Sequence, residues 1–364
     1  MIKIDRRLYL SFDWLLFLAV ILLSCAGIAA IWSTTDGTSL NSYFGKQIIY
    51  VCCGLVAFGV LLCIDYHFLS DFITFIYLAG MGVLGIVLII GRSIHSNKSW
   101  IDIGIFSFQP SELMKILVVI ALAKYYSELD LEYLGFRELL IGALIVFVPA
   151  FMVVLQGDLG TAVTFFPIYA VLTFLAGVRR KHVIVLLIIL AAAAPVTWFC
   201  LRGYQRGRIQ TVINPSSDPR GLGYQTAQSE IAIGYGRFLG KGFKQGSQGL
   251  LGFLPARNTD FVFAVLAEEK GFAGSITILG LFLLTSFRLF RIAREAKDKV
   301  GAYIVIGVLA IMLFHFIINV GMVVGFLPIL GIPLPFVSAG GSSLISFFAA
   351  MSLCIGVGMR RYVN

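Results

Sequence analysis

The chain has 364 residues, of which 59% are hydrophobic and 13% are charged, and its formal net charge is +9 at pH 7. An ordinary soluble domain contains about 25% charged residues, so this composition excludes that class of protein. We expect lipid rather than water to be the main solvent of the folded chain.

Long apolar runs recur along the whole sequence. A helix that crosses a hydrocarbon core of roughly 30 Å needs about 20 mostly apolar residues, and the chain contains about ten such runs. The sequence therefore predicts an all-α, polytopic integral membrane protein with a single transmembrane domain, residues 1–364. We expect the first span to stay in the membrane rather than be cleaved as a signal peptide, because its apolar run is long. The predicted spans are 13–33, 47–64, 68–91, 111–126, 138–155, 160–177, 183–201, 270–287, 301–325 and 341–358.

Lys and Arg gather in alternate connections between these spans. Because short basic loops resist translocation, the pattern places both termini in the cytoplasm and the polar loop 202–269 outside. That loop is itself basic, which indicates an anionic partner such as a lipid phosphate, although adhesion to acidic headgroups explains it equally well. We expect no nucleic acid there. The clusters are Lys3, Arg6 and Arg7, then residues 179–181 and 288–299, then Arg360 and Arg361.

Four polar segments interrupt the predicted outer side, at residues 92–115, 156–161, 202–269 and 326–343. Each combines Gly or Pro with ionisable or hydroxyl side chains, as expected where irregular backbone lines a wet cavity rather than lipid. The six cysteines have neither metal-ligand spacing nor a paired framework, so we interpret them as small apolar packing residues.

In the first polar segment, Pro110 is predicted to begin a helix, since its missing N–H costs nothing in a first turn. Glu112 and Lys115 are then three residues apart on one helical face, just inside the bilayer. A charge at that depth costs about 2.5–3.5 kcal/mol, so we expect the two to pair in the bundle interior or in a cavity. Two interpretations follow: the Glu112–Lys115 pair takes part in the function of the protein, or it is a structural ion pair that only orders the helices.

Asp158 lies between two glycines in the second polar segment. It can cap the helix that follows. It can equally join Glu112 in holding a divalent cation, because hard oxygen ligands suit such ions. Both interpretations stand on the sequence.

The third polar segment contains a predicted amphipathic helix at residues 224–233, then a Gly-rich stretch with Arg237 and Lys241 that could cradle phosphate. Asp260 stands where this loop becomes apolar again. A carboxylate at a membrane surface could serve as general base for a sugar hydroxyl, but by chemistry alone a helix N-cap is its commoner use. We interpret the carboxylates at 268–269 as capping or structural charges.

The fourth polar segment breaks an apolar region with prolines and glycines. In a transporter such a break indicates a substrate site. It could also form a rigid re-entrant segment that walls a lipid groove.

Together these motifs resemble the SEDS family of bacterial cell-wall polymerases over nearly the whole chain. Residues 264–269 and 319–322, and the short N-terminus, look more like the elongation branch of that family than its division branch. The motifs are Phe108-Gln-Pro-Ser-Glu112 with Lys115, Gly157-Asp-Leu-Gly-Thr161, Asn214-Pro with Asp218-Pro and Gly223-Tyr-Gln225, Thr259-Asp-Phe-Val-Phe-Ala-Val-Leu-Ala-Glu-Glu269, and Pro333-Leu-Pro-Phe-Val-Ser338 with Gly340-Gly-Ser342.

The resemblance implies a peptidoglycan glycosyltransferase of the bacterial cytoplasmic membrane. Such an enzyme polymerises lipid II into β-1,4-linked glycan at the extracytoplasmic face and releases undecaprenyl pyrophosphate. Expected partners are a class B penicillin-binding protein and the rod complex proteins, and the expected cofactor is Mg²⁺ or Mn²⁺. The implied residues are Asp260 as the catalytic carboxylate, Glu112, Lys115 and Asp158 as substrate-binding cavity residues, Glu112 and Asp158 as metal ligands, and Lys46 and Arg208 as pyrophosphate contacts.

The chain departs from the usual family pattern at Ala339, at Lys270 and at Arg257-Asn258. The last departure changes the charge beside Asp260 and so bears on its pKa or its substrate contacts. Alternative functions are a lipid II flippase, a division-type polymerase, and a structural scaffold for a transpeptidase. Glycan synthesis, transport without polymer, and loss of partner binding alone would distinguish the enzyme, the flippase and the scaffold.

Overall fold

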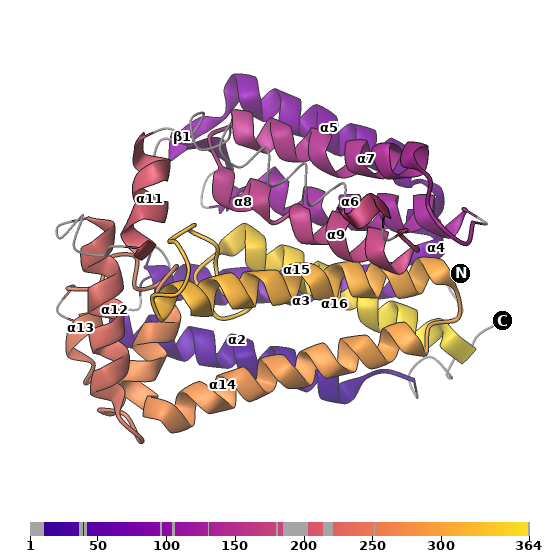
Figure 1. Ribbon diagram of the computed structural model, residues 1–364. Helices are drawn as coiled ribbons and strands as arrows, with labels where there is room; N and C mark the ends of the chain where they lie inside the picture. The colour runs from indigo at the N-terminus through magenta and orange to yellow at the C-terminus, as the bar shows by residue number, and fades with distance from the viewer. Residues whose placement is uncertain are drawn as a thin grey trace.

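The fold is described here from a computed structural model, in residues 11–35, 39, 42–94, 97–103, 106–129, 131–179, 181–184, 203–213, 221–250 and 252–362. Within them the protein is a bundle of long helices lying side by side (Figure 1). Six of the described helices are long and apolar enough to cross a membrane. The predicted polytopic, all-helical membrane fold is confirmed.

The predicted spans correspond to single helices or to helix pairs. Span 183–201 is the exception, because beyond residue 184 it lies outside the described residues. The single helices are α2 (Trp14–Thr34), α3 (Tyr43–Cys63), α6 (Pro110–Ser127), α7 (Phe136–Leu155), α14 (Val262–Arg294), α15 (Lys299–Val323) and α16 (Gly341–Met359). The pairs are α4 (Tyr66–Asp71) with α5 (Ile73–Ile90), and α8 (Leu159–Val163) with α9 (Phe166–Leu175).

Local chemistry sets where several helices begin. The Asp13 carboxylate accepts the Leu16 N–H at 3.0 Å and caps α2. Asp298 caps α15 in the same way, through the Gly301 N–H at 2.7 Å. Pro110 occupies the first turn of α6, as its sequence context predicts.

A small antiparallel sheet precedes α6. The sequence did not predict this sheet. It consists of β1 (Arg92–Ile94), β2 (Asn97–Ile103) and β3 (Phe106–Phe108), in that order. Strands β1 and β3 have three residues each, and β2 opens with three polar residues and does not alternate clearly over its seven, so the sequence of this segment indicated polarity but no strand. The hairpin leads directly into Gln109 and the first turn of α6.

The described part of the predicted loop 202–269 forms three helices before α14, namely α11 (Gly203–Ile213), α12 (Leu222–Gly236) and α13 (Ser247–Leu250). The predicted helix 224–233 lies inside α12, which confirms it. Gly271 interrupts α14 at φ 64° and ψ −160°, a conformation that suits glycine. The stretch after α12 packs closely on this kink, because a Cβ on Gly271 would overlap the Gly240 backbone. The glycines at 236–242 therefore serve close packing, and the Lys241 ammonium pairs with Glu268 at 2.9 Å.

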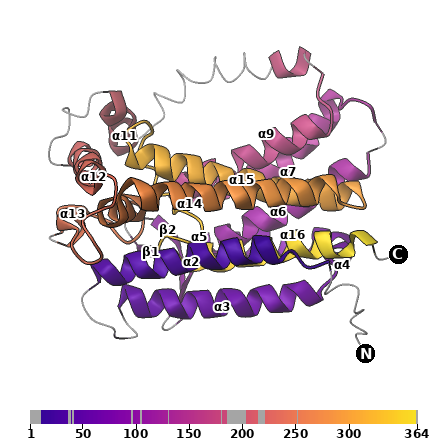
Figure 2. The same cartoon turned by 90° about the horizontal axis from the view of Figure 1, so that it is seen from below.

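The two ends of the bundle differ in their polar chemistry. At one end, an ion pair joins α2 to α14 through Asp13 and Arg288 at 2.7 Å, and the Tyr66 hydroxyl of α4 donates a hydrogen bond to Asp298 at 2.5 Å. Helices α11, α12 and α13 lie at the other end (Figures 1 and 2). The basic residues at 288–291 and 360–361 thus share the first end, where Arg360 pairs with Asp65 at 3.3 Å.

Gly27 on α2 offers a test of how tightly the fourth polar segment is packed. A Cβ on Gly27 would lie 2.7 Å from the Val337 Cα, whereas one on Gly59 of α3 would meet nothing within 4 Å. We expect Gly27→Ala to lower the free energy of unfolding by about 1–3 kcal/mol through overpacking. Gly59→Ala should be neutral or stabilising. Thermal unfolding in detergent would measure both, and equal midpoints would contradict the packing described here.

Candidate active site

Asp260 lies on an irregular loop at the end of the bundle that carries α11–α13. The carbonyl of Ala256, whose φ is 51°, accepts the N–H groups of Thr259 and Asp260 at 3.1 Å each. Helix α14 begins at Val262, and its N-cap is Phe261 with no side-chain cap bond. Asp260 is therefore not the helix cap, and the commoner use of such a residue does not account for it. Its side chain is partly exposed.

The loop is fixed by hydrogen bonds from segments far away in sequence. Asn319 on α15 donates from Nδ2 to the Asp260 carbonyl at 3.0 Å and to the Ile332 carbonyl at 2.9 Å. Ser338 donates from Oγ to the Thr259 carbonyl at 2.6 Å. The backbone carbonyl of Asp260 is thus held from α15, and the preceding carbonyl, of Thr259, is held from the fourth polar segment.

The departures at Arg257-Asn258 take part in the same framework. The Arg257 guanidinium donates to the Gly249 carbonyl, and Thr34 on α2 donates to the Asn258 side-chain oxygen. The Asn258 carbonyl accepts the Ala339 N–H at 2.8 Å. These two residues thus stabilise the loop, and the departure at Ala339 leaves its backbone bond intact.

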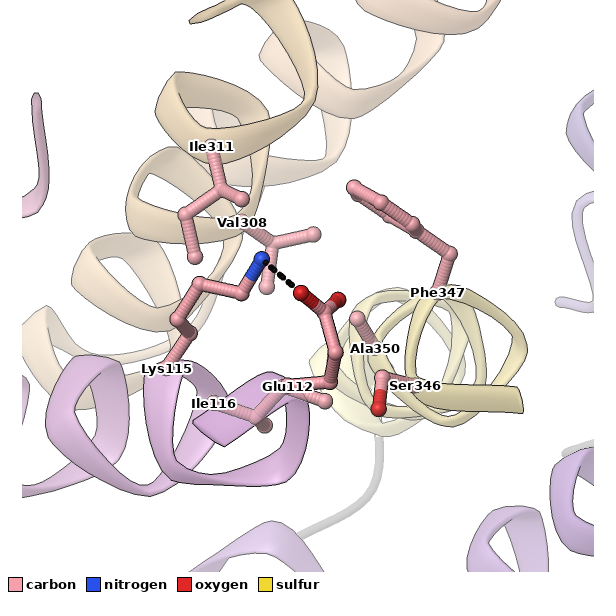
Figure 3. A pocket seen from close by; sticks show the side chains of 8 residues that line it. All are labelled: Glu112, Lys115, Ile116, Val308, Ile311, Ser346, Phe347 and Ala350. Atoms are coloured by element: carbon pink, nitrogen blue, oxygen red, sulfur yellow. Dashed lines mark hydrogen bonds and ion pairs between the residues drawn. The ribbon is translucent and has the colours of Figure 1, made fainter. Parts of the chain in front are cut away.

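Glu112 and Lys115 form the buried ion pair that their spacing predicts. Lys115 Nζ lies 3.0 Å from Glu112 Oε1 and 3.0 Å from His315 Nε2, and the three side chains are almost fully buried. Figure 3 shows the pair on α6, between Val308 and Ile311 of α15 and Phe347 of α16. The pocket around them is only about 10 Å³, the size of one water molecule. Substrate contact by this pair remains a prediction, because the pair is enclosed in this structure.

Asp158 caps α8, as one of its two interpretations predicts. Its Oδ1 accepts the Thr161 N–H at 3.1 Å, and its Oδ2 accepts from Gln109 Nε2 at 2.6 Å and from the Thr161 hydroxyl at 2.9 Å. Gln109 immediately precedes α6, so this bond joins the first and second polar segments.

The four polar segments meet at one end of the bundle. Besides the bond from Gln109 to Asp158, the Gln109 N–H donates to Ser342 at 2.8 Å, which joins the first segment to the fourth. Ser338 joins the fourth to the third at Thr259. A Cβ on Gly331 would lie 3.9 Å from Asp260 Oδ2, so the fourth segment passes directly beside the carboxylate.

An open cleft adjoins the Asp260 loop. Its volume is about 390 Å³, within the range of about 300–1,000 Å³ typical of ligand sites. It is lined by Thr34 and Thr35 at the end of α2, Tyr43 of α3, Gly252 and residues 254–259. Lys46 is exposed one turn beyond Tyr43, and Arg208 lies on α11 at the same end of the bundle (Figure 1).

The carboxylates do not fit a protein-held metal site in this arrangement. The described part of the chain contains no group of three or more His, Cys, Asp or Glu side chains placed to hold a metal ion. Glu112 Oε1 faces the Lys115 ammonium, and both Asp158 oxygens accept from N–H or O–H donors. Glu112 and Asp158 as metal ligands remain a prediction.

The sequence interpretation missed His315 as a site residue. A lone histidine in an apolar run is usually a core residue, so its type alone gave no signal. The spacing of His315 and Asn319 gave a usable signal, because residues four apart share one face of a helix, here α15. Both side chains reach the fourth polar segment, at Pro333 and Ile332.

Comparisons with known proteins agree with this architecture. The family model FtsW/RodA/SpoVE, described as cell cycle protein, matches residues 6–362. Peptidoglycan glycosyltransferase MrdB of Escherichia coli K12 is 35% identical over 356 residues, covering 98% of this chain and 95% of MrdB.

Two solved structures extend the similarity. A chain from "Structural coordination of polymerization and crosslinking by a peptidoglycan synthase complex" is 29% identical, with a TM-score of 0.84 and coverage of 97% of this chain and 99% of that chain. The rod shape determining protein RodA of Thermus thermophilus is 26% identical, with a TM-score of 0.75 and coverage of 98% and 99%.

The buried pair can be tested by removing one charge or both. Lys115→Met leaves the Glu112 carboxylate buried without its cation, and we expect the free energy of unfolding to fall by about 3–5 kcal/mol. Adding Glu112→Gln should restore part of that loss. Lys124→Met, on the same helix, breaks a surface pair of 3.8 Å with Glu128 and an exposed hydrogen bond of 3.5 Å to the Asp71 carbonyl, and it should cost under about 1 kcal/mol. Unfolding in detergent would compare the variants, and a Lys115→Met protein as stable as Lys124→Met would refute the pairing.

Proposed function

This chain belongs to the FtsW/RodA/SpoVE family, and we propose that it is the bacterial peptidoglycan glycosyltransferase of cell elongation, a RodA-type enzyme that polymerises lipid II. The observation that carries the proposal is Asp260, which is partly exposed, is not the N-cap of α14, and lies on a loop that hydrogen bonds join to α15 and to the fourth polar segment. The family model spans the elongation, division and sporulation branches, so the elongation assignment rests on residues 264–269 and 319–322.

In the proposed reaction, Asp260 acts as general base. The 4-hydroxyl of the acceptor sugar attacks the anomeric carbon of the donor, the new C–O bond forms, and the bond from that carbon to the pyrophosphate oxygen breaks. The leaving undecaprenyl pyrophosphate takes the electron pair, and Asp260 takes the hydroxyl proton. Attack opposite the leaving group inverts the anomeric centre, which converts an α-linked phosphate into a β-1,4 bond. A placed base contributes about 10²–10⁴-fold to such a step.

The leaving pyrophosphate needs positive charge near it. Lys46 and Arg208 are the proposed contacts, because Lys46 lies one turn beyond Tyr43, which lines the cleft beside the Asp260 loop, and Arg208 lies on α11. The cleft beside the Asp260 loop is the proposed sugar site, since it is wide enough for a ligand and is lined by hydroxyl and amide side chains.

The proposed orientation places this end of the bundle on the extracytoplasmic side, with both termini in the cytoplasm. The basic clusters at the opposite end support it by the positive-inside rule. The proposed partners are a class B penicillin-binding protein, which would crosslink the new strands, and the rod complex proteins. The similarity to a chain of a peptidoglycan synthase complex that coordinates polymerisation and crosslinking supports the first of them.

A divalent cation, Mg²⁺ or Mn²⁺, is proposed to enter with the substrate pyrophosphate. We expect EDTA to abolish glycan synthesis and added Mg²⁺ to restore it. Because the described residues form no three-ligand site, Mg²⁺ should leave the unfolding temperature of the substrate-free protein unchanged. A rise in that temperature that Glu112→Gln removes would instead place the ion on the protein.

Asp260→Asn tests the function directly. The neutral amide cannot accept the hydroxyl proton, so we expect glycan synthesis from lipid II by the purified chain with its partner to fall at least about 10²-fold. Asp71→Asn, at an exposed position on α4, is the matched control and should retain activity. Size-exclusion profiles and thermal unfolding would show that both proteins fold.

Normal polymerisation by folded Asp260→Asn would refute the assignment. Lipid II transport in vesicles without any polymer would favour a flippase. A loss confined to partner binding would favour a scaffold.

A further inference from the structure

The buried Lys115 ammonium starts a chain of hydrogen bonds that leads away from Glu112. An ammonium can only donate, so His315 Nε2, 3.0 Å from Nζ, must accept. His315 Nδ1 lies 3.1 Å from the Pro333 carbonyl oxygen, which can only accept. The two partners therefore fix a neutral imidazole with its proton on Nδ1, and His315 joins α6 to the fourth polar segment.

The peptide bond between Pro333 and Leu334 carries the chain onward. Its carbonyl accepts from His315, and its N–H, on Leu334, donates to Ser338 Oγ at 2.9 Å. Ser338 Oγ then donates to the Thr259 carbonyl at 2.6 Å. Every bond from Lys115 to Thr259 points in the same direction, so each polarises the next.

The chain ends at the peptide bond that precedes the proposed catalytic residue. The N–H of that peptide belongs to Asp260 and donates to the Ala256 carbonyl at 3.1 Å. A second attachment lies one helical turn away, where Asn319 holds the carbonyls of Asp260 and Ile332. Helix α15 thus fixes consecutive carbonyls of the fourth segment through His315 and Asn319.

We propose that His315 and Ser338 are positioning residues of the glycosyl transfer reaction, which connect the Lys115 ammonium to the Thr259–Asp260 peptide and thereby set the position of the Asp260 carboxylate. The proposal rests on the proposed function of Asp260. It gives the Glu112–Lys115 pair a role at a distance, consistent with the enclosure of both side chains.

Two features favour positioning over simple packing. His315 and Ser338 are only 1% and 2% exposed. His315 Nδ1 nevertheless bonds to the Pro333 carbonyl outside its own helix, and Ser338 Oγ bonds to the Thr259 carbonyl outside its own turn. The loop that they hold has irregular backbone, so it has no helix or sheet ladder of its own to fix Asp260. A displacement of about 1 Å in a catalytic group can cost about 10²-fold in rate.

Ser338→Ala and His315→Leu break the chain at two points. We expect each to lower kcat for glycan synthesis by about 10- to 100-fold, with KM for lipid II changed by less than about threefold, since the base is misplaced while the substrate cleft stays. His315→Gln should recover most of kcat, because its amide oxygen and nitrogen are separated by one carbon as the two ring nitrogens are. The double variant Ser338→Ala/His315→Leu should be no slower than the slower single variant, as expected for two links of one chain.

Ser352→Ala is the matched control. Ser352, on α16, is equally buried, and its Oγ donates to the Phe58 carbonyl at 2.6 Å. This bond is not part of the hydrogen-bond chain from Lys115 to Thr259. We expect Ser352→Ala to lose stability as Ser338→Ala does while keeping kcat. Ser338→Ala removes a single oxygen and carries the test by itself if His315→Leu does not fold.

The outcomes separate this proposal from the function on which it rests. If the wild-type chain makes no glycan, or if Asp260→Asn makes it normally, the proposed function fails. If the wild type is active and Asp260→Asn is not, but Ser338→Ala keeps the kcat of Ser352→Ala, the positioning role is overturned. Multiplied losses in the double variant, or no recovery with His315→Gln, would also overturn it.

Discussion

The constraint on which the molecule depends is the burial of a positive charge inside a membrane bundle. Lys115 is 2% exposed, and an ammonium at that depth must be both neutralised and hydrogen-bonded to be tolerated. Glu112 supplies the charge and His315 supplies the acceptor, so α6 and α15 must approach at this point. The position of α15 then determines which carbonyls of the fourth polar segment can be held.

A consequence is that the irregular end of the bundle is ordered from within. The polar segments are joined by side chains at the ends of helices and on them, through Gln109 immediately before α6 and Asn319 on α15. Backbone groups removed from water need such partners, because an unsatisfied one costs about 1–3 kcal/mol. The same bonds that make irregular backbone tolerable there also bring the segments into contact, which places Asp260 beside Gly331.

Sequence reasoning succeeded where one local property decides the outcome. Apolar run length located the spans, the three-residue spacing of Glu112 and Lys115 predicted their pairing, and Asp158 caps a helix as its context allows. It failed where distant segments decide. The partners of His315 lie on other elements, and the strands within residues 92–108 show no clear alternating period. Asp260 is not the N-cap of α14, because that helix begins two residues later.

A base at a membrane surface faces opposing requirements. It must be exposed enough to stay ionised and meet a sugar, yet held closely enough to receive a proton along a defined direction. Asp260 meets them with different parts of the residue: its carbonyl and the preceding one are bonded to Asn319 and Ser338, while its side chain stays partly exposed. Phe261 rather than Asp260 is the N-cap of α14, so the loop backbone that Asn319 and Ser338 hold gives Asp260 an attachment that does not depend on the first turn of that helix.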